Sequence, residues 1–305
     1  MSDHIAHLGI CDDTLRLAMC HPNIHEAYKR VMAEYRDIAH MGAVTRSADK
    51  WSADLILWAR QEVSKPEAQR DQMLWQKLAF VLGALTHRAA DRLTKPITRC
   101  WGGGEDSGRA DSEANESKIM QDIFVFKELY AGGEGGLAEP FTAMVLRVPV
   151  AEGQAKAEEY FRVLLRRALI SMHTISPDRG NMQPWLTAFL RELQSFPKSL
   201  SQYAQLAGEW APAKVKKYLI DKNFYCREDD LIRLARDIQC GSTVPGGRVV
   251  EAVAATDKTH SRYARALAKA IDYLLAAGDL FDGRLSLEEA KGRFDVGVPE
   301  LSLQD

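Results

Sequence analysis

The sequence predicts an all-α protein. Almost every periodic segment repeats its apolar residues at helical spacing, and neither a convincing alternating strand nor an internal repeat occurs. A content of 46% hydrophobic and 27% charged residues is typical of globular proteins and excludes wholesale disorder. The 305 residues are enough for one large or two small domains with a buried core.

In the first hundred residues the apolar spacing predicts several helices before a proline-marked break. Pro22 suits a first helical position, because its missing N–H would be unpaired there. Lys95-Pro96 is expected to end the last of these helices, because the residue before proline is pushed out of the helical region. The expected helices cover residues 13–20, 22–40, 48–62 and 69–93.

Residues 102–117 are rich in Gly, Ser and acidic side chains, with almost nothing to bury, and this composition predicts a mobile loop. The loop is the best candidate boundary between an N-terminal unit (1–101) and a helical region (118–305) that includes a C-terminal extension. The helices expected in that region cover 118–130, 140–146, 154–173, 182–195, 199–208, 212–220, 227–238, 247–277 and 285–292.

Composition also limits the function classes. A net charge of −2 argues against a general nucleic-acid binder. No segment has the length of apolar sequence that a membrane span needs, and the first residues lack the features of a secretory signal. The five cysteines are scattered and include no C-x-x-C pair, which favours a reducing compartment and predicts a cytoplasmic protein.

The histidines are concentrated near the N-terminus, with six of the eight in the first 87 residues. His87 and Asp91 lie one helical turn apart in a nearly apolar segment, so their side chains share one face of a buried helix. A buried carboxylate is unfavourable unless it is paired or bound to metal, and an imidazole beside it suits a divalent cation. The alternative is that Asp91 pairs with a nearby basic residue (Arg88, Arg92 or Lys95) while His87 is a hydrogen-bonded core residue. Gly83 would let a neighbouring helix approach closely.

A second set of candidate ligands precedes this helix. Asp12 and Asp13 are adjacent carboxylates, and His25 follows about a dozen residues later. Either aspartate could instead cap a helix N-terminus, which is a frequent role of Asp. One of the two could then cap while the other binds a metal.

Together these residues resemble the zinc-dependent phospholipase C family. The resemblance covers roughly residues 4–97 and rests on two elements. One is Gly-x-x-x-His-x-x-x-Asp followed by proline, and the other is an earlier Gly-x-x-Asp with a histidine about 13 residues on. The family shares its helical fold and metal cluster with the S1/P1 nucleases. The resemblance implies that Asp12 or Asp13, His25, His87 and Asp91 surround one zinc, and that His7 (or else His4) reaches a second zinc bridged by Asp91.

The chain departs from the family pattern in two places. Lys95-Pro96 stands where family members have a further histidine ligand, and the later His-x-x-x-Glu pair is missing. Glu116 and Asp122 are the best substitutes for that pair. One or two zinc ions are therefore expected rather than three.

The function expected from this resemblance is zinc-dependent hydrolysis of phosphoric esters, either phosphodiesters or phospholipid head groups, by a metal-activated water. Whichever of Asp12 and Asp13 does not bind metal would act as general base. Nucleic acid is expected only as a substrate. The alternative function is a non-catalytic helical scaffold or partner-binding protein that retains a degenerate form of the fold.

Overall fold

The structure is a computed structural model that describes residues 4–45, 51–99, 107–130, 202–203, 205–206 and 211–298. These residues form helices and connecting turns, with no strand among them, which confirms the all-α prediction. The chain divides into two compact units, one formed by residues 10–96 and 225–305 and the other by residues 1–9 and 97–224.

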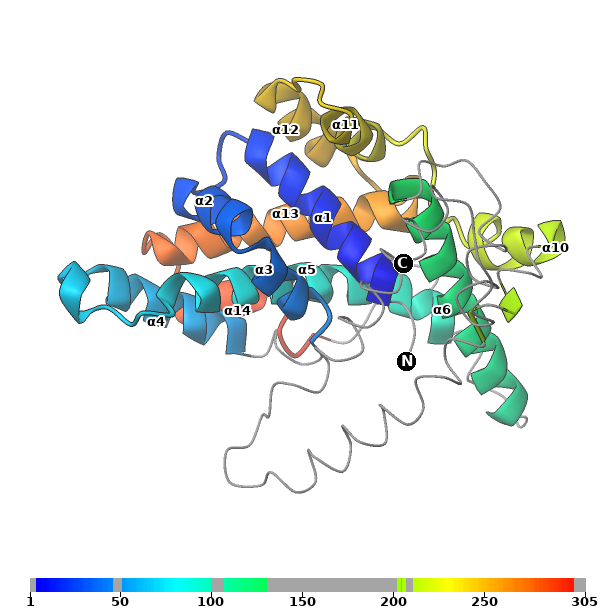
Figure 1. The fold of residues 1–305 in the computed structure, drawn as a ribbon, viewed down its shortest axis with the longest axis horizontal. Helices are drawn as coiled ribbons and strands as arrows, with labels where there is room; N and C mark the ends of the chain where they lie inside the picture. Colours follow the sequence, from blue (N-terminus) through cyan, green and yellow to red (C-terminus); the bar gives the residue numbers. More distant parts are fainter. Residues whose placement is uncertain are drawn as a thin grey trace, which may run out of the picture. The chain divides into compact units, whose positions relative to one another are not determined.

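The larger unit, formed by residues 10–96 and 225–305, contains most of the described helices (Figure 1). In chain order they are α1 (His4–Cys20, from residue 10 on), α2 (Glu26–Glu34), α3 (Arg36–Ala43), α4 (Ser52–Val63), α5 (Leu74–Arg99, up to residue 96), α11 (Asp230–Gln239), α12 (Gly246–Ala255), α13 (Arg262–Phe281) and α14 (Leu287–Arg293). A short 3₁₀ turn, η2 (Glu67–Gln69), precedes α5.

Helix α13 is the centre of this unit. Its first turn is capped by Ser261, whose hydroxyl accepts a hydrogen bond from the N–H of Ala264 at 3.3 Å. The helix packs against α4, α11, α12 and α14. It also meets α5, where the Arg262 guanidinium donates to the carbonyl of Leu93 at 3.1 Å. In Figure 1, α13 and α5 run across the view in similar directions, and α1 passes across α13.

Helix α5 is the buried helix that the apolar sequence predicts. Val81, Leu82, Leu85 and Ala89 on its apolar stripe have no exposed surface. The helix does not end at Lys95-Pro96 as expected but continues to Arg99. A proline there removes one N–H from the hydrogen-bond ladder, and the preceding residue nevertheless keeps the helical conformation.

Two of the expected helices are each divided in the structure. The segment 22–40 does not begin at Pro22: a turn leads to His25, which caps α2, and Tyr35 separates α2 from α3. The segment 247–277 is interrupted by residues 256–261, so that α12 and α13 are separate helices. His25 and Ser261 supply side-chain caps at the starts of α2 and α13, whereas Tyr35 makes no side-chain cap at the start of α3.

In the smaller unit, helix α6 (Ser107–Leu129) replaces much of the loop expected at 102–117. The loop prediction is wrong for residues 107–117, because this polar segment gains partners far along the chain. Glu116 binds Lys214 at 2.7 Å, and Glu113 binds Lys217 at 3.2 Å. These lysines belong to α10 (Pro212–Val215) and to a π-helical turn, η3 (Lys216–Ile220).

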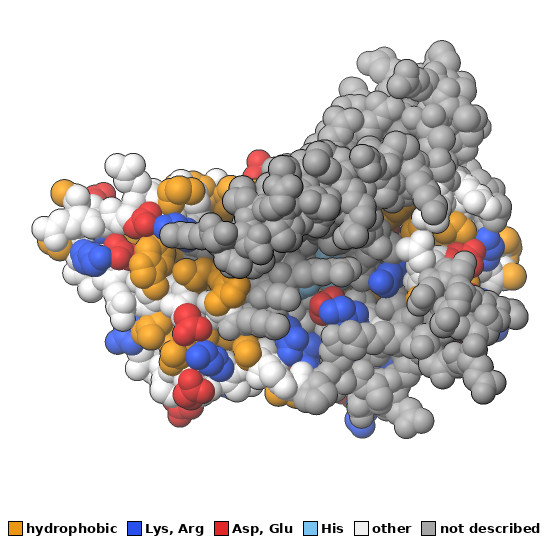
Figure 2. Space-filling view, turned by 90° about the horizontal axis from the view of Figure 1, so that it is seen from below, with side chains coloured by type: hydrophobic (Ala, Val, Ile, Leu, Met, Phe, Trp, Pro, Cys, Tyr) orange, Lys and Arg blue, Asp and Glu red, His pale blue; other side chains and the backbone are white. Residues whose placement is uncertain are grey.

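The helices expected at 140–146, 154–173 and 182–195, and most of that at 199–208, lie outside the described residues. None of the helices in the described part of the chain combines the length and apolar character needed to cross a bilayer. On the face drawn in Figure 2, the described acidic and basic side chains are interspersed with apolar ones rather than gathered by charge.

Candidate metal centre

The candidate metal centre is built on α5. His87 and Asp91 lie one turn apart on this helix, and His87 Nε2 is 3.4 Å from Asp91 Oδ2. Both side chains are nearly buried, with 8% and 11% of their surfaces exposed. The shared helical face predicted from the i, i+4 spacing is therefore present.

The orientation of the His87 ring is set by helix α3. His87 Nδ1 lies 2.9 Å from the carbonyl oxygen of Ala43, the last residue of α3. A carbonyl oxygen only accepts hydrogen bonds, so Nδ1 must carry the proton in this contact. In neutral His87 the lone pair is then on Nε2, which faces Asp91. Metal-binding histidines are commonly oriented in this way by a backbone carbonyl.

Helix α3 can reach His87 because it crosses α5 at two glycines. A Cβ placed on Gly83 would lie 1.9 Å from the carbonyl oxygen of Ala39, and one on Gly42 would lie 2.0 Å from that of Phe80. Both distances are far inside any allowed contact, so only glycine permits this crossing. The close helix approach expected at Gly83 is confirmed, and it places the Ala43 carbonyl beside His87.

His7 completes a group of three possible ligands with His87 and Asp91. Each of the three buried residues offers one ligand atom, and these atoms all lie within 4.8 Å of one another. Two imidazole nitrogens and one carboxylate oxygen are atoms that bind divalent cations in proteins.

The ammonium group of Lys95 would compete with a metal ion for the Asp91 carboxylate. Lys95 lies one turn beyond Asp91 and forms an ion pair with its Oδ2. The expected pairing of Asp91 with a nearby basic residue is therefore confirmed for Lys95. It coexists with the histidine contact, and a metal ion would have to share the carboxylate with Lys95 or displace it.

Asp12 belongs to a different network. Its buried carboxylate accepts from His40 Nε2 at 2.6 Å and from the Arg36 guanidinium at 2.7 Å. Sequence reasoning placed His40 at the C-terminus of its helix, where its charge would be favourable, but missed Asp12 as its partner. The ligand role predicted for Asp12 stays a prediction, since the group of three described above does not include it.

Asp13 joins α1 to α11 and α13. Its carboxylate accepts from Tyr263 Oη at 2.9 Å and from Arg16 at 2.6 Å, and it forms an ion pair with Arg236. Burial raises the pKa of Asp13, and the two guanidinium groups oppose this effect. With these donors around it, Asp13 is placed to hold helices together. The general-base role predicted for Asp12 or Asp13 stays a prediction.

His25 caps helix α2. Its Nδ1 accepts from the N–H of Ala27 at 3.1 Å, and its Nε2 lies 3.1 Å from Asp282. The ring also contacts Phe281, with the ring centroids 5.1 Å apart. The structure does not bring His25 into the group with His87, and its predicted zinc ligation stays a prediction.

The two residues considered as substitutes for the missing pair have other partners. Tyr218 donates its hydroxyl to Glu116 at 2.6 Å. Asp122 is fully buried and accepts from the backbone N–H of Ala6 at 2.8 Å and from the hydroxyl of Tyr203 at 2.5 Å. A carboxylate at the first turn of α1 is favoured by the helix dipole. The side chain of His4, the alternative to His7, lies outside the described residues.

Comparisons of the chain with protein-family models, with curated proteins and with solved structures found no match. What the residues themselves establish is a helical fold in which His7, His87 and Asp91 form a group that could hold a metal ion.

Proposed function

We propose that this protein is a metal-dependent hydrolase of phosphoric esters, with zinc held by His7, His87 and Asp91. The observation that carries the proposal is the orientation of His87. The Ala43 carbonyl holds its Nδ1 proton, so the Nε2 lone pair of the neutral ring faces the Asp91 carboxylate at 3.4 Å. Two electron-rich atoms at that distance repel each other unless a cation or a proton lies between them.

Zinc suits this set of ligands because it prefers imidazole nitrogen and carboxylate oxygen, and three protein ligands are typical of catalytic zinc sites. When bound, zinc would supply Lewis-acid activation of a water molecule for attack on a phosphoric ester. The chain's own contribution is to fix the ligands. Ala43 orients His87, and burial of all three ligands keeps competing solvent away.

The ion pair between Lys95 and Asp91 favours a second candidate, a non-catalytic helical scaffold. In that case the Lys95 ammonium, rather than a metal ion, pairs with Asp91, and His87 is a hydrogen-bonded core residue. The two candidates differ in metal content, which makes them separable by measurement.

The test is elemental analysis of the purified full chain, together with hydrolysis of bis(p-nitrophenyl) phosphate. We expect stoichiometric zinc and measurable turnover, both lost in His87→Ala, with zinc affinity weakened more than about 100-fold. His260→Ala, which removes an imidazole outside the group, should change neither. A metal-free wild type whose activity survives in His87→Ala would refute the proposal and favour the scaffold.

His25→Ala separates two possible ligand sets. If His7, His87 and Asp91 hold the zinc, this variant should keep its metal and lose only the cap of α2. Loss of zinc in His25→Ala would instead support the ligand set implied by the family resemblance.

A further inference from the structure

A pocket separate from the His7–His87–Asp91 group lies between α5 and α13, and we call it the α5–α13 pocket. Its volume is about 590 Å³, within the range of roughly 300–1,000 Å³ that small-molecule sites occupy. Helix α5 contributes Arg92 and Leu93, which project from other sides of the helix than His87 and Asp91. The other lining residues are Val253, Thr256, Asp257, Lys258, Arg265, Ala268, Lys269, Asp272 and Asp295.

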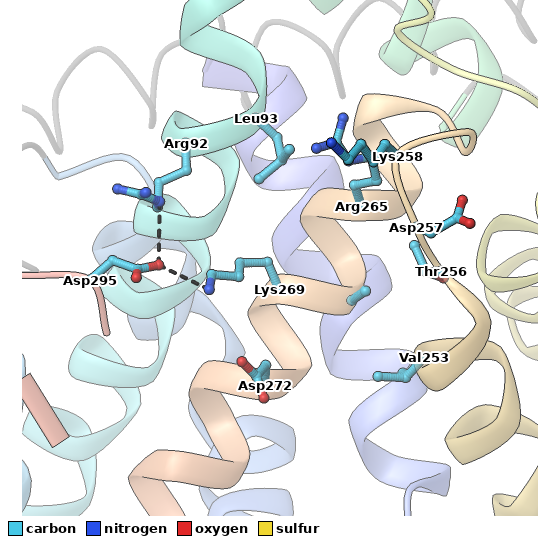
Figure 3. A pocket seen from close by; sticks show the side chains of 11 residues that line it. Arg92, Leu93, Val253, Thr256, Asp257, Lys258, Arg265, Lys269, Asp272 and Asp295 are labelled. Atoms are coloured by element: carbon cyan, nitrogen blue, oxygen red, sulfur yellow. Dashed lines mark ion pairs between the residues drawn. The ribbon is translucent and has the colours of Figure 1, made fainter. Parts of the chain in front are cut away.

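The three carboxylates of the pocket already have donors. Asp295 binds Lys269 at 2.9 Å and Arg92 at 3.3 Å, and Figure 3 shows these ion pairs along one side of the pocket. Asp272 binds Arg293 at 3.2 Å.

Asp257 accepts from Thr259 through both its N–H at 2.9 Å and its hydroxyl at 2.6 Å. These hydrogen bonds hold the pKa of Asp257 at about 2. The carboxylates of the pocket are thus engaged with other groups.

Four basic side chains line the pocket beside its three carboxylates: Arg92, Lys258, Arg265 and Lys269. Arg92 and Lys269 share the single carboxylate of Asp295. Lys258 is exposed and has no ion-pair partner within the part of the chain that the structure describes. Figure 3 shows Lys258 and Arg265 close together in the view, above the Asp295 ion pairs. The pocket therefore presents cationic donors from α5, from α13 and from the segment that precedes α13.

We propose that the α5–α13 pocket binds a small organic phosphate, with Lys258 and Arg265 contacting the phosphate group. A phosphate dianion accepts several charge-assisted hydrogen bonds at once and suits converging lysine and arginine side chains. Leu93, Val253 and Ala268 supply apolar surface for the organic part of the ligand. The proposal does not depend on zinc, because no residue of the metal group lines the pocket.

The test is isothermal titration calorimetry of the full chain with glycerol 3-phosphate, inorganic phosphate and uncharged glycerol, in buffer containing a chelator. We expect glycerol 3-phosphate to bind at least about tenfold more tightly than glycerol, with Lys258→Gln weakening it about tenfold and Lys258→Arg restoring it. Arg248→Gln is the matched control, because it removes one exposed charge outside the pocket and should leave binding unchanged. Equal affinity in wild type and Lys258→Gln would overturn the proposal.

Two further measurements locate the phosphate. His87→Ala should bind glycerol 3-phosphate as the wild type does, whether or not the proposed hydrolase activity exists. Binding that requires added zinc, or that disappears in His87→Ala, would place the phosphate at the metal centre and refute the pocket. If inorganic phosphate binds as tightly as glycerol 3-phosphate, the apolar surface contributes nothing and a specific organic ligand is excluded.

Discussion

The Ala43 carbonyl oxygen and His87 Nδ1 are 2.9 Å apart, although 44 residues separate them in the chain. This contact connects the last residue of α3 to the helix that carries the candidate ligands. It depends on the crossing of α3 and α5 at Gly42 and Gly83, because any larger residue at either position would separate the helices.

Gly83→Ala should therefore damage both the fold and the metal site. Its new methyl group would lie 1.9 Å from the carbonyl oxygen of Ala39, so α3 must move away from α5. We expect a loss of about 1–3 kcal/mol in the free energy of unfolding, measured by urea titration, and about tenfold weaker zinc binding. In Gly292→Ala the methyl group meets no atom within 4 Å, so this control should be neutral or slightly stabilising. Equal stability of the two variants would contradict the crossing.

Lys95→Met should strengthen zinc binding while destabilising the metal-free protein. Removal of the ammonium leaves the nearly buried Asp91 carboxylate without its lysine partner. A divalent cation then no longer competes with Lys95 for this carboxylate. Competition titration against a chromogenic chelator measures the affinity, and thermal unfolding with and without zinc measures the stability. Lys65→Met removes a lysine that pairs with another nearly buried carboxylate, Glu62, and should not affect zinc. Unchanged zinc affinity in Lys95→Met would show that the ammonium does not compete.

Asp13→Asn should lower the free energy of unfolding of the larger unit. The substitution leaves the guanidinium groups of Arg16 and Arg236 without their buried carboxylate, and breaking such a pair typically costs about 3–5 kcal/mol. The urea midpoint measures the loss. Asp230→Asn breaks an exposed pair with Arg233 and should cost less than about 1 kcal/mol. A loss of hydrolysis in Asp13→Asn without loss of stability would instead support the predicted general-base role.

His21 should make stability depend on pH below neutrality. Burial lowers the pKa of His21 in the folded protein, and its Nδ1 accepts a hydrogen bond from the N–H of Asn23 at 3.2 Å, which protonation at Nδ1 would remove. The unfolded chain then binds more protons, so stability is full above about pH 6.5 and falls as the pH drops toward the lowered folded-state pKa. Urea titrations between pH 7.5 and 5 should show a smaller decline in His21→Gln than in the wild type. Parallel declines would contradict this assignment.

Within the described residues, the sequence alone located most of the buried helices. Apolar spacing located α5, placed His87 and Asp91 on one of its faces and marked Gly83 as a point of close approach, because these properties depend on neighbours within a few turns. The same reasoning missed the break at Tyr35, the continuation of α5 through Pro96 and the helical state of residues 107–117. Distant ion pairs of Glu113 and Glu116 accompany the helical state of residues 107–117, whereas Tyr35 makes no side-chain cap.

Only the tertiary structure decided which polar residues meet. The family resemblance implied that His7 and Asp91 share a zinc, and the structure groups them with His87. Asp12 instead paired with His40 and Arg36, and Asp13 with Arg236 and Tyr263. A buried carboxylate requires a donor or a cation, but the sequence does not say which of several chemically equivalent partners will supply it. That choice depends on how helices far apart in the chain cross. A hydrogen bond to a backbone carbonyl, such as that of Ala43, cannot be recognised from residue types, because every residue has a carbonyl group.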